Sequence, residues 1–140
     1  MTEALAKEVS GVPKGQLIEL VSKELESNPS IKAPDWVFQT KSGQHATRPI
    51  EDLRFWPKRL ASLLLAVMHE PAGVSSLRTK YGGRRKHSVS RTHHKPAGGK
   101  IIRLGFQQLE LAGFVKKDKK GRMITPKGES LVSKVASSVQ

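Results

Sequence analysis

The stretch from Ser76 to Ile101 concentrates the side chains with the most evident chemistry in this 140-residue chain. It contains eight lysines or arginines, three histidines and no acidic residue. Over the longer interval 71–109 there are nine basic residues and again no Asp or Glu. Each cation that contacts a phosphate releases condensed counterions, so such a cluster binds nucleic acid tightly and in a salt-dependent way. With a net charge of +13 for the whole chain, this pattern predicts a polyanionic partner.

Two glycine-basic motifs bound this stretch. The glycine pair 82–83 directly precedes the basic triplet 84–86, and a second pair, 98–99, precedes Lys100. Glycine lets backbone N–H groups approach an anion closely, and arginine clamps anionic oxygens in pairs. The second pair stands at the start of a predicted helix, where free N–H groups and the helix dipole favour phosphate. Tyr81 fits either stacking on an unpaired base or packing inside the domain, and the sequence leaves both open.

The composition argues against several other classes of protein. There is no cysteine, which excludes disulfides, thiolate zinc sites and cysteine catalysis. The five histidines show no H-E-x-x-H spacing, and neither a G-x-S-x-G elbow nor a nucleotide P-loop is present. The longest apolar run, 60–68, is too short to span a bilayer, and the first residues lack a signal pattern. We predict a cytoplasmic, non-enzymatic protein with no metal, no cofactor, no small-molecule substrate and no membrane partner.

Apolar periodicity predicts a mainly α fold in a single domain, 1–140. The predicted helix from Trp56-Pro57 to His69 has the widest apolar face, which makes it the central helix of the core. Gly105, inside a later helix, costs about 1 kcal/mol relative to alanine. Residues 1–13 are expected to be a loose N-terminal arm. The remaining expected elements are helices over 14–28, 74–80 and 101–111, strands over 114–118 and 122–125, and a last helix from Pro126 capped by Thr125.

From residue 73 onward the expected order of elements is that of a winged-helix module, a variant of the helix-turn-helix. The part 73–140 is therefore winged-helix-like, with a basic insertion over 82–99 where an ordinary helix-turn-helix has a few residues. The alternative function is a winged-helix DNA-binding transcription regulator. Its reading helix would expose Arg103, Gln107, Gln108 and Glu110, and the glutamines would read adenine edges. Because the insertion would obstruct the groove or fill it, we favour RNA over DNA; a basic adaptor that docks only proteins is a third hypothesis.

Four segments resemble one family in order and spacing. They are "PDWV" (34–37), "FWPKRLAS" (55–62), "GVSSLRTKYGGRRK" (73–86) and the stretch 98–136 that begins "GGKIIRLGF" and ends through "ITPKGESLVSKVA". Together they resemble the eukaryotic and archaeal small-subunit ribosomal protein nineteen family. The resemblance implies a helical bundle around a central amphipathic helix, with a winged-helix-like module and a small C-terminal β-hairpin. It also implies a place on ribosomal RNA in the head of the small subunit, beside neighbouring ribosomal proteins, and a role in subunit assembly, maturation and translation.

The resemblance also implies which residues face RNA. The matched motifs give Arg59, Tyr81, Gly82, Gly83, Arg84 and Arg85. Charge alone adds Lys58, Lys80, Lys86, Arg91, Lys95, Lys100 and Arg103. Relatives often carry further arginines where this chain has Leu65 and Ala66, so the central helix is expected to contact RNA through Lys58 and Arg59 only. The middle of the basic stretch, 87–97, is expected to be the least ordered part without RNA.

Overall fold

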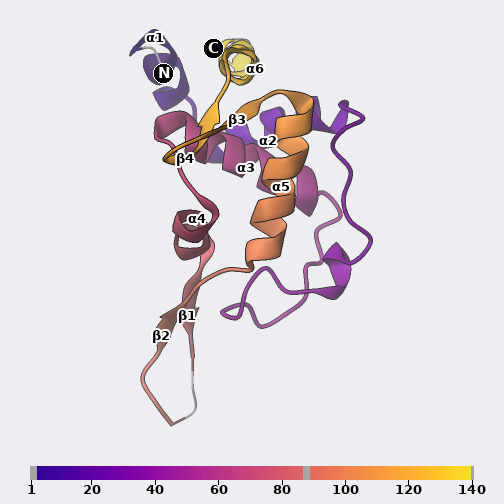
Figure 1. Cartoon of the computed structure of the whole chain (residues 1–140), viewed down its shortest axis with the longest axis vertical. Helices are drawn as coiled ribbons and strands as arrows, with labels where there is room; N and C mark the ends of the chain where they lie inside the picture. The colour runs from indigo at the N-terminus through magenta and orange to yellow at the C-terminus, as the bar shows by residue number, and fades with distance from the viewer. Residues whose placement is uncertain (1–2, 87–88, 140) are drawn as a thin grey trace.

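The computed structural model describes residues 3–86 and 89–139, and this part of the chain is mainly helical (Figure 1). The predicted mainly α class is confirmed, whereas the winged-helix arrangement stays a prediction. The strands form two separate antiparallel hairpins, β1–β2 and β3–β4. The elements are α1 (Glu3–Ser10), α2 (Lys14–Glu26), the 3₁₀ helix η1 (Val37–Gln39), α3 (Phe55–His69), α4 (Val74–Tyr81), β1 (Gly83–Arg85), β2 (His93–Lys95), α5 (Gly99–Ala112), β3 (Val115–Asp118), β4 (Gly121–Ile124) and α6 (Pro126–Val139).

Helix α3 lies at the centre of the core. Trp56, Leu60 and all residues over 63–68 are buried, so the helix is covered on more than the single stripe that an amphipathic surface helix would bury. Helix α2 packs along it, and α5 crosses it on another side. Since each large apolar side chain contributes about 1.5–3 kcal/mol when fully buried, this helix holds the surrounding elements in place. No helix in the described part of the chain is long and apolar enough to cross a membrane.

The loose N-terminal arm expected over 1–13 is a wrong prediction for the described residues. Residues 3–10 form α1, and Leu5, Val9 and Val12 are buried. The helix packs against α6, and the Ser133 hydroxyl donates a hydrogen bond of 2.8 Å to the Glu8 carboxylate. Three apolar side chains at spacings of four and three make a stripe too short to predict a helix alone. Packing against α6 stabilises it.

The basic insertion also contains regular structure. Strands β1 and β2 pair antiparallel, with Arg84 opposite His94, and the hairpin projects away from the helical body (Figure 1). The basic insertion over 82–99, for which the sequence predicted no strand, therefore has regular structure at its base. His87 and Ser88, in the middle of the stretch, lie outside the described residues. The strands show no apolar alternation, so the sequence pattern gave no reason to expect them.

The C-terminal part follows the sequence-based prediction closely. Gly113 ends α5 in the left-handed conformation, at φ 84°, and Thr125 caps α6 by accepting a 3.4 Å hydrogen bond from the Gly128 N–H. The β3–β4 hairpin is additionally joined to the turn after α3, because Ala72 and Arg122 exchange backbone hydrogen bonds of 3.2 and 2.9 Å. Gly121 sits at φ 130°, a conformation that other residues rarely adopt.

Gly105 allows α5 to lie close against α3. A Cβ atom at this position would lie 2.7 Å from Cδ1 of Leu63, which is fully buried. The helix-propensity penalty of the glycine is thus offset by a contact that no other residue permits. Close packing of the two helices therefore requires a glycine at this position, although glycine is unfavourable inside a helix.

We expect Gly105→Ala to lower the free energy of unfolding by about 1 kcal/mol, because overpacking costs about 1–3 kcal/mol and the propensity gain returns about 1 kcal/mol. Urea unfolding followed by circular dichroism measures the change. In a Leu63→Val background, which lacks the clashing Cδ1, the same substitution should be neutral or stabilising. A single variant more stable than the parent would contradict the close-contact argument.

Candidate nucleic-acid interface

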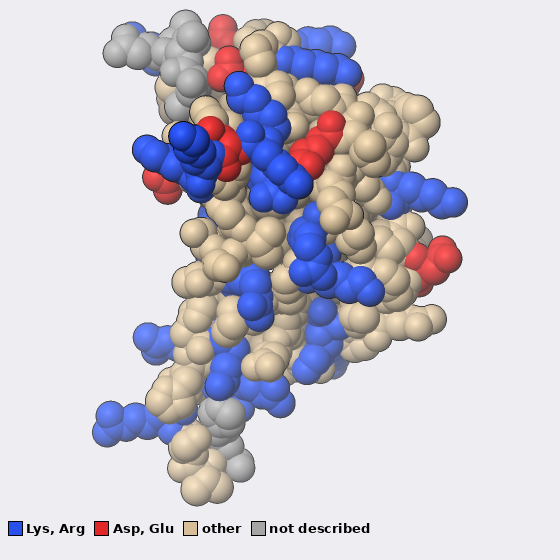
Figure 2. All heavy atoms as spheres, in the orientation of Figure 1, with Lys and Arg blue, Asp and Glu red and all other residues tan. Residues whose placement is uncertain are grey.

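Basic side chains cover the end of the molecule formed by β1–β2, α4 and the start of α5. Figure 2 shows Lys and Arg over the whole visible face, whereas the acidic side chains lie over its upper and middle parts and none is visible over the lower end. The acid-free interval of the sequence is therefore also a surface poor in acids in space. A surface with this charge distribution attracts phosphate groups and steers a polyanion toward it.

The first glycine-basic motif builds the base of the hairpin. Arg84 and Arg85 are exposed on β1, and Arg85 donates a 3.2 Å hydrogen bond from Nη1 to the carbonyl of Gln44. Lys86 continues the strand into solvent, and Arg91 is exposed on the return path. Lys95, half-buried on β2, pairs with Gly83. The structure thus brings five predicted residues onto one hairpin.

The two glycines of this motif are needed for close packing. A Cβ atom on Gly82 would lie 2.3 Å from the backbone oxygen of Lys95, and one on Gly83 would lie 2.9 Å from Cδ2 of His45. The sequence predicts that these glycines let an anion approach the backbone. The structure gives a further reason, which is that β2 and the His45 ring approach the chain here. His45 was missed because no local spacing links it to the hairpin.

The second glycine-basic motif begins α5, as predicted. The Gly98 N–H donates to the carbonyl of Ser42 at 3.0 Å, so this N–H group already has a partner in the protein. Arg78, which the sequence analysis did not include, covers Gly99 and donates from Nε to the carbonyl of Ala97 at 2.9 Å. The Lys100 ammonium lies 4.7 Å from the centre of the Trp36 ring, and Arg103 is exposed one turn further along.

Arg59 is held between two aromatic rings. Its guanidinium carbon lies 4.2 Å from the centre of the Tyr81 ring and 5.1 Å from that of Phe55. A 2.6 Å hydrogen bond joins the Tyr81 hydroxyl to Ser62. Tyr81 therefore packs against the core helix, as one of its two possible roles requires, while its ring stays partly exposed and its contact with RNA stays a prediction. The geometry joins the two predicted residues Arg59 and Tyr81 into one unit.

Burial changes the electrostatics of this unit. Desolvation lowers the pKa of Arg59 and raises the pKa of Tyr81, while Ser62 and Arg59 partly oppose the shift at the tyrosine. The guanidinium stays protonated at neutral pH all the same, because arginine does not deprotonate in proteins. Within the described residues no ion pair links Arg59 to a carboxylate. A positive charge without an acidic partner is thus held in a fixed orientation beside a hollow of about 220 Å³.

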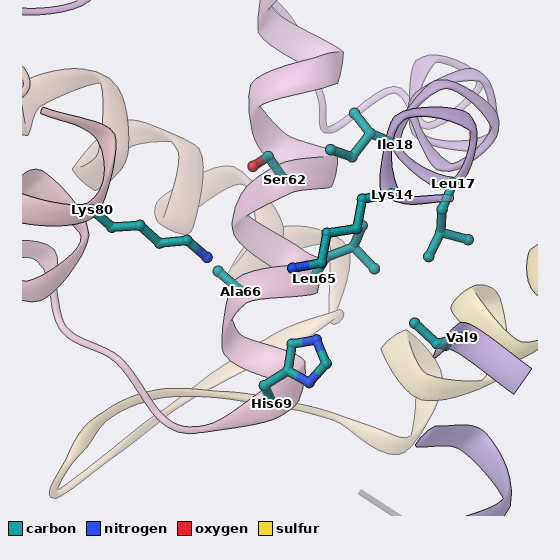
Figure 3. A pocket seen from close by; sticks show the side chains of 9 residues that line it. All are labelled: Val9, Lys14, Leu17, Ile18, Ser62, Leu65, Ala66, His69 and Lys80. Atoms are coloured by element: carbon teal, nitrogen blue, oxygen red, sulfur yellow. The ribbon is translucent and has the colours of Figure 1, made fainter. Parts of the chain in front are cut away.

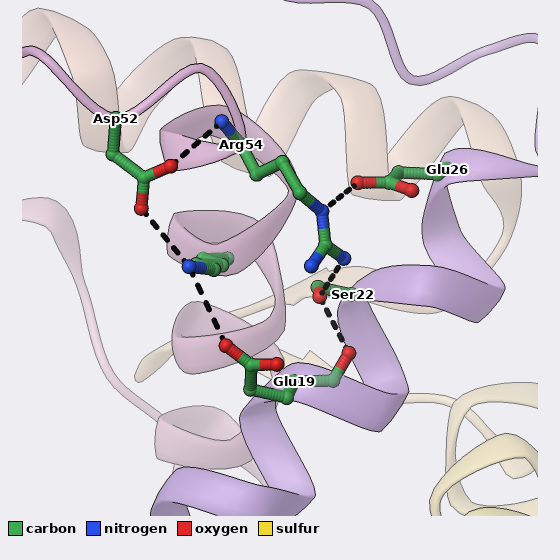
Figure 4. A network of polar contacts seen from close by, with 6 residues as sticks. Glu19, Ser22, Glu26, Asp52 and Arg54 are labelled. Carbon is green, nitrogen blue, oxygen red and sulfur yellow. Dashed lines mark hydrogen bonds and ion pairs between the residues drawn. The ribbon is translucent and has the colours of Figure 1, made fainter.

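Lys58 lies in a different electrostatic setting from its neighbour. Its ammonium pairs with Asp52 at 2.9 Å and with Glu19 at 3.4 Å, in a network that joins α2 to α3 (Figure 4). The hydrogen bond that the Lys58 ammonium donates to the Asp52 carboxylate lowers the pKa of Asp52 and raises the pKa of Lys58. In the same network Arg54 pairs with Glu26 at 2.7 Å. Two carboxylates therefore compete with any phosphate for Lys58, whose RNA contact stays a prediction.

Lys80 lines a separate hollow between α2, α3 and α4 (Figure 3). This hollow has a volume of about 60 Å³. It is also lined by Lys14 and His69 and by the apolar side chains of Leu65 and Ala66. These two apolar side chains are buried, in keeping with an RNA contact limited to the first turns of α3. Ser62 borders both this cavity and the Arg59 hollow, so the two lie next to each other.

The face of α5 that a DNA-reading helix would use is already occupied. The Gln108 side-chain oxygen accepts hydrogen bonds from Trp56 Nε1 at 2.7 Å and from the Lys32 N–H at 3.2 Å, and its amide donates to the Lys32 carbonyl at 2.7 Å. Glu110 pairs with Arg122 at 2.7 Å. Two of the four side chains named for base reading therefore serve the fold, which argues against α5 as a reading helix.

Comparison with known proteins places the chain in a family. The family model described as ribosomal protein S19e matches residues 8–140. The chain belongs to the ribosomal protein S19e family. It is 40% identical over 132 residues to the small ribosomal subunit protein eS19 of Aeropyrum pernix, covering 91% of this chain and 86% of that protein. It is 41% identical over 135 residues to the eS19 protein of Haloarcula marismortui, with coverages of 91% and 88%.

A more distant S19e relative also matches over nearly the full length. The eS19G protein of Ascaris suum is 28% identical over 138 residues, covering 96% of this chain and 93% of that protein. The matches thus include the hairpin and both glycine-basic motifs. The family resemblance predicted from the four sequence segments is confirmed.

We expect Gly82→Ala to separate β1 from β2, because the added methyl group would meet the backbone oxygen of Lys95, which moves only if the strand moves. Cross-strand nuclear Overhauser contacts in the hairpin should disappear while helical circular dichroism is retained. Gly73→Ala is the matched control, since a Cβ there has no neighbour within 4 Å. Persistence of the cross-strand contacts in Gly82→Ala would show that the close approach is not required.

Proposed function

We propose that the chain is a structural constituent of the small ribosomal subunit that binds ribosomal RNA. The observation that carries this proposal is the acid-poor basic surface built by β1–β2, α4 and the start of α5 in a member of the S19e family. Phosphate groups of a folded RNA are complementary to such a surface in charge. The relatives whose names place them in the small ribosomal subunit support the same assignment.

The proposed site is the head of the subunit, beside neighbouring ribosomal proteins. There the protein supports subunit assembly, maturation and translation in the cytoplasm, without catalysis. The hairpin supplies exposed phosphate ligands, chiefly Arg84, Lys86 and Arg91. Arg59 supplies a charge whose orientation is already fixed by two rings, so little side-chain entropy is lost when RNA binds.

The winged-helix-like arrangement belongs to the same proposal. In it α4 and α5 are the two helices, β3–β4 is the wing, and β1–β2 is an insertion between the helices. The insertion carries the charge, and the packed face of α5 contributes to the core. The module therefore binds RNA through its insertion, whereas a DNA-binding regulator contacts base edges through its second helix.

The location is tested by density-gradient fractionation of a cell lysate at moderate salt. We expect the protein to sediment with small ribosomal subunits, and to move to the top of the gradient when ribonuclease digests the RNA. If the protein stays at the top while intact small subunits sediment, the ribosomal proposal fails.

The RNA surface is tested by Arg84→Ala/Arg85→Ala. We expect weaker binding to small-subunit ribosomal RNA and a log–log salt slope reduced by about two, one for each phosphate contact. The control Lys7→Ala/Lys134→Ala also removes two charges, on α1 and α6 at the opposite end of the molecule (Figure 1), and should leave the slope unchanged. An equal effect of both pairs would show that only net charge matters.

A further inference from the structure

A cleft opens between the segment 41–47 and strand β1. Its volume is about 550 Å³, within the range of about 300–1,000 Å³ typical of sites for single small molecules. That size suits a nucleotide or two of one strand. The lining residues include four cations and no acid, and they are Lys41, Gln44, His45, Ala46, Thr47, Arg84, Arg85 and Lys86.

The two walls of the cleft are fixed to one another. Arg85 donates to the Gln44 carbonyl at 3.2 Å, directly across the cleft. Below it, Gly43 and Ala97 form an isolated antiparallel bridge, and the Gly98 N–H donates to the Ser42 carbonyl at 3.0 Å. The His45 ring fills the space over Gly83. The two walls are therefore joined by backbone contacts at Gly43–Ala97 and Ser42–Gly98 and by one charged side chain, that of Arg85.

Several polar groups at the cleft have no partner within the described part of the protein. The Thr47 hydroxyl and the Gln44 side-chain amide are exposed on the wall of the cleft and the structure gives them no hydrogen bond to another described residue, so they are free to bind a ligand in place of solvent. The buried His45 Nδ1 atom is also without a partner. Unpaired hydrogen-bonding groups beside four cations fit a ligand that carries both anionic oxygens and hydroxyl groups.

We infer that this cleft binds the sugar–phosphate backbone of a single RNA strand, and that Thr47 and Gln44 recognise the ribose 2′-hydroxyl. Lys41 and the basic side chains of β1 hold the phosphates from the two sides. The 2′-hydroxyl is both donor and acceptor, and it is the group that distinguishes RNA from DNA. This inference rests on the proposed RNA-binding function and extends the interface to a segment that the sequence analysis did not include.

The recognition of the 2′-hydroxyl is tested with two probes, a twelve-nucleotide oligouridylate and the matching oligodeoxyuridylate, by fluorescence anisotropy. We expect the whole protein to bind the ribose probe more tightly. Thr47→Val keeps the shape of the side chain and removes its hydroxyl, and it should reduce the RNA-to-DNA affinity ratio by about three- to tenfold, as expected for one lost hydrogen bond. A wild-type ratio of one, no binding of the ribose probe, or an unchanged ratio in the variant would each overturn the inference.

The position of the strand is tested by filling the cleft without changing its charge. Ala46→Trp should weaken binding of the ribose probe at least tenfold, and Lys41→Ala should lower the salt slope by about one, with Lys7→Ala as the control. Circular dichroism and thermal melting check the fold, and Lys41→Ala still tests the inference if Ala46→Trp does not fold. If the cleft variants bind like the parent while Arg84→Ala/Arg85→Ala does not, the inference is wrong and the proposed function stands. If the parent fails to sediment with small subunits, the proposed function itself is wrong.

Discussion

The close crossing of α5 over α3 at Gly105 fixes the position of the basic surface relative to the core. Helix α3 is buried on several sides, and α5 reaches it because a hydrogen atom occupies the place of a methyl group. Helix α5 begins at Gly99, shortly after strand β2 ends at Lys95. The orientation of α5 therefore sets where the hairpin leaves the body and where Lys100 meets the Trp36 ring. A contact between apolar atoms in the core thus determines the geometry of a polar surface at the end of the molecule.

The distribution of acids gives the cations of this protein two different roles. Lys58 and Arg54 lie beside carboxylates and join α2 to α3, so their charges contribute to the fold. Such partly exposed pairs are worth little energy each, at about 0–1 kcal/mol, but a phosphate group must compete with the carboxylates for those cations. Arg59, one residue along the chain from Lys58, packs between two rings and pairs with no carboxylate in the described structure. Neighbouring basic residues therefore differ in function because of what the fold places beside them.

Sequence patterns predicted the elements whose stability is local or periodic. The helices now named α2, α3 and α6 follow from apolar spacing, and Thr125 and Gly113 act as the predicted caps. The short α1 was missed because its three buried side chains depend on α6. The hairpin β1–β2 was missed because backbone pairing and glycine contacts form it, without an apolar face. The acid-poor basic surface was predictable from charge, but the contacts of His45, Arg78 and Gln108 join residues far apart in the chain and could not be predicted from local patterns.

The contacts that anchor the β1–β2 hairpin to the body are mainly polar. The Ala97 N–H donates to the Arg78 carbonyl at 2.9 Å, and a ring nitrogen of His94 lies 3.1 Å from the Thr79 oxygen. A two-stranded hairpin without an apolar face is only marginally stable on its own. It therefore forms a separate cooperative unit that opens locally at a lower free energy than the α3 core. The core keeps its structure through its own packing, whereas the population of the closed hairpin rises with every ligand that binds to it.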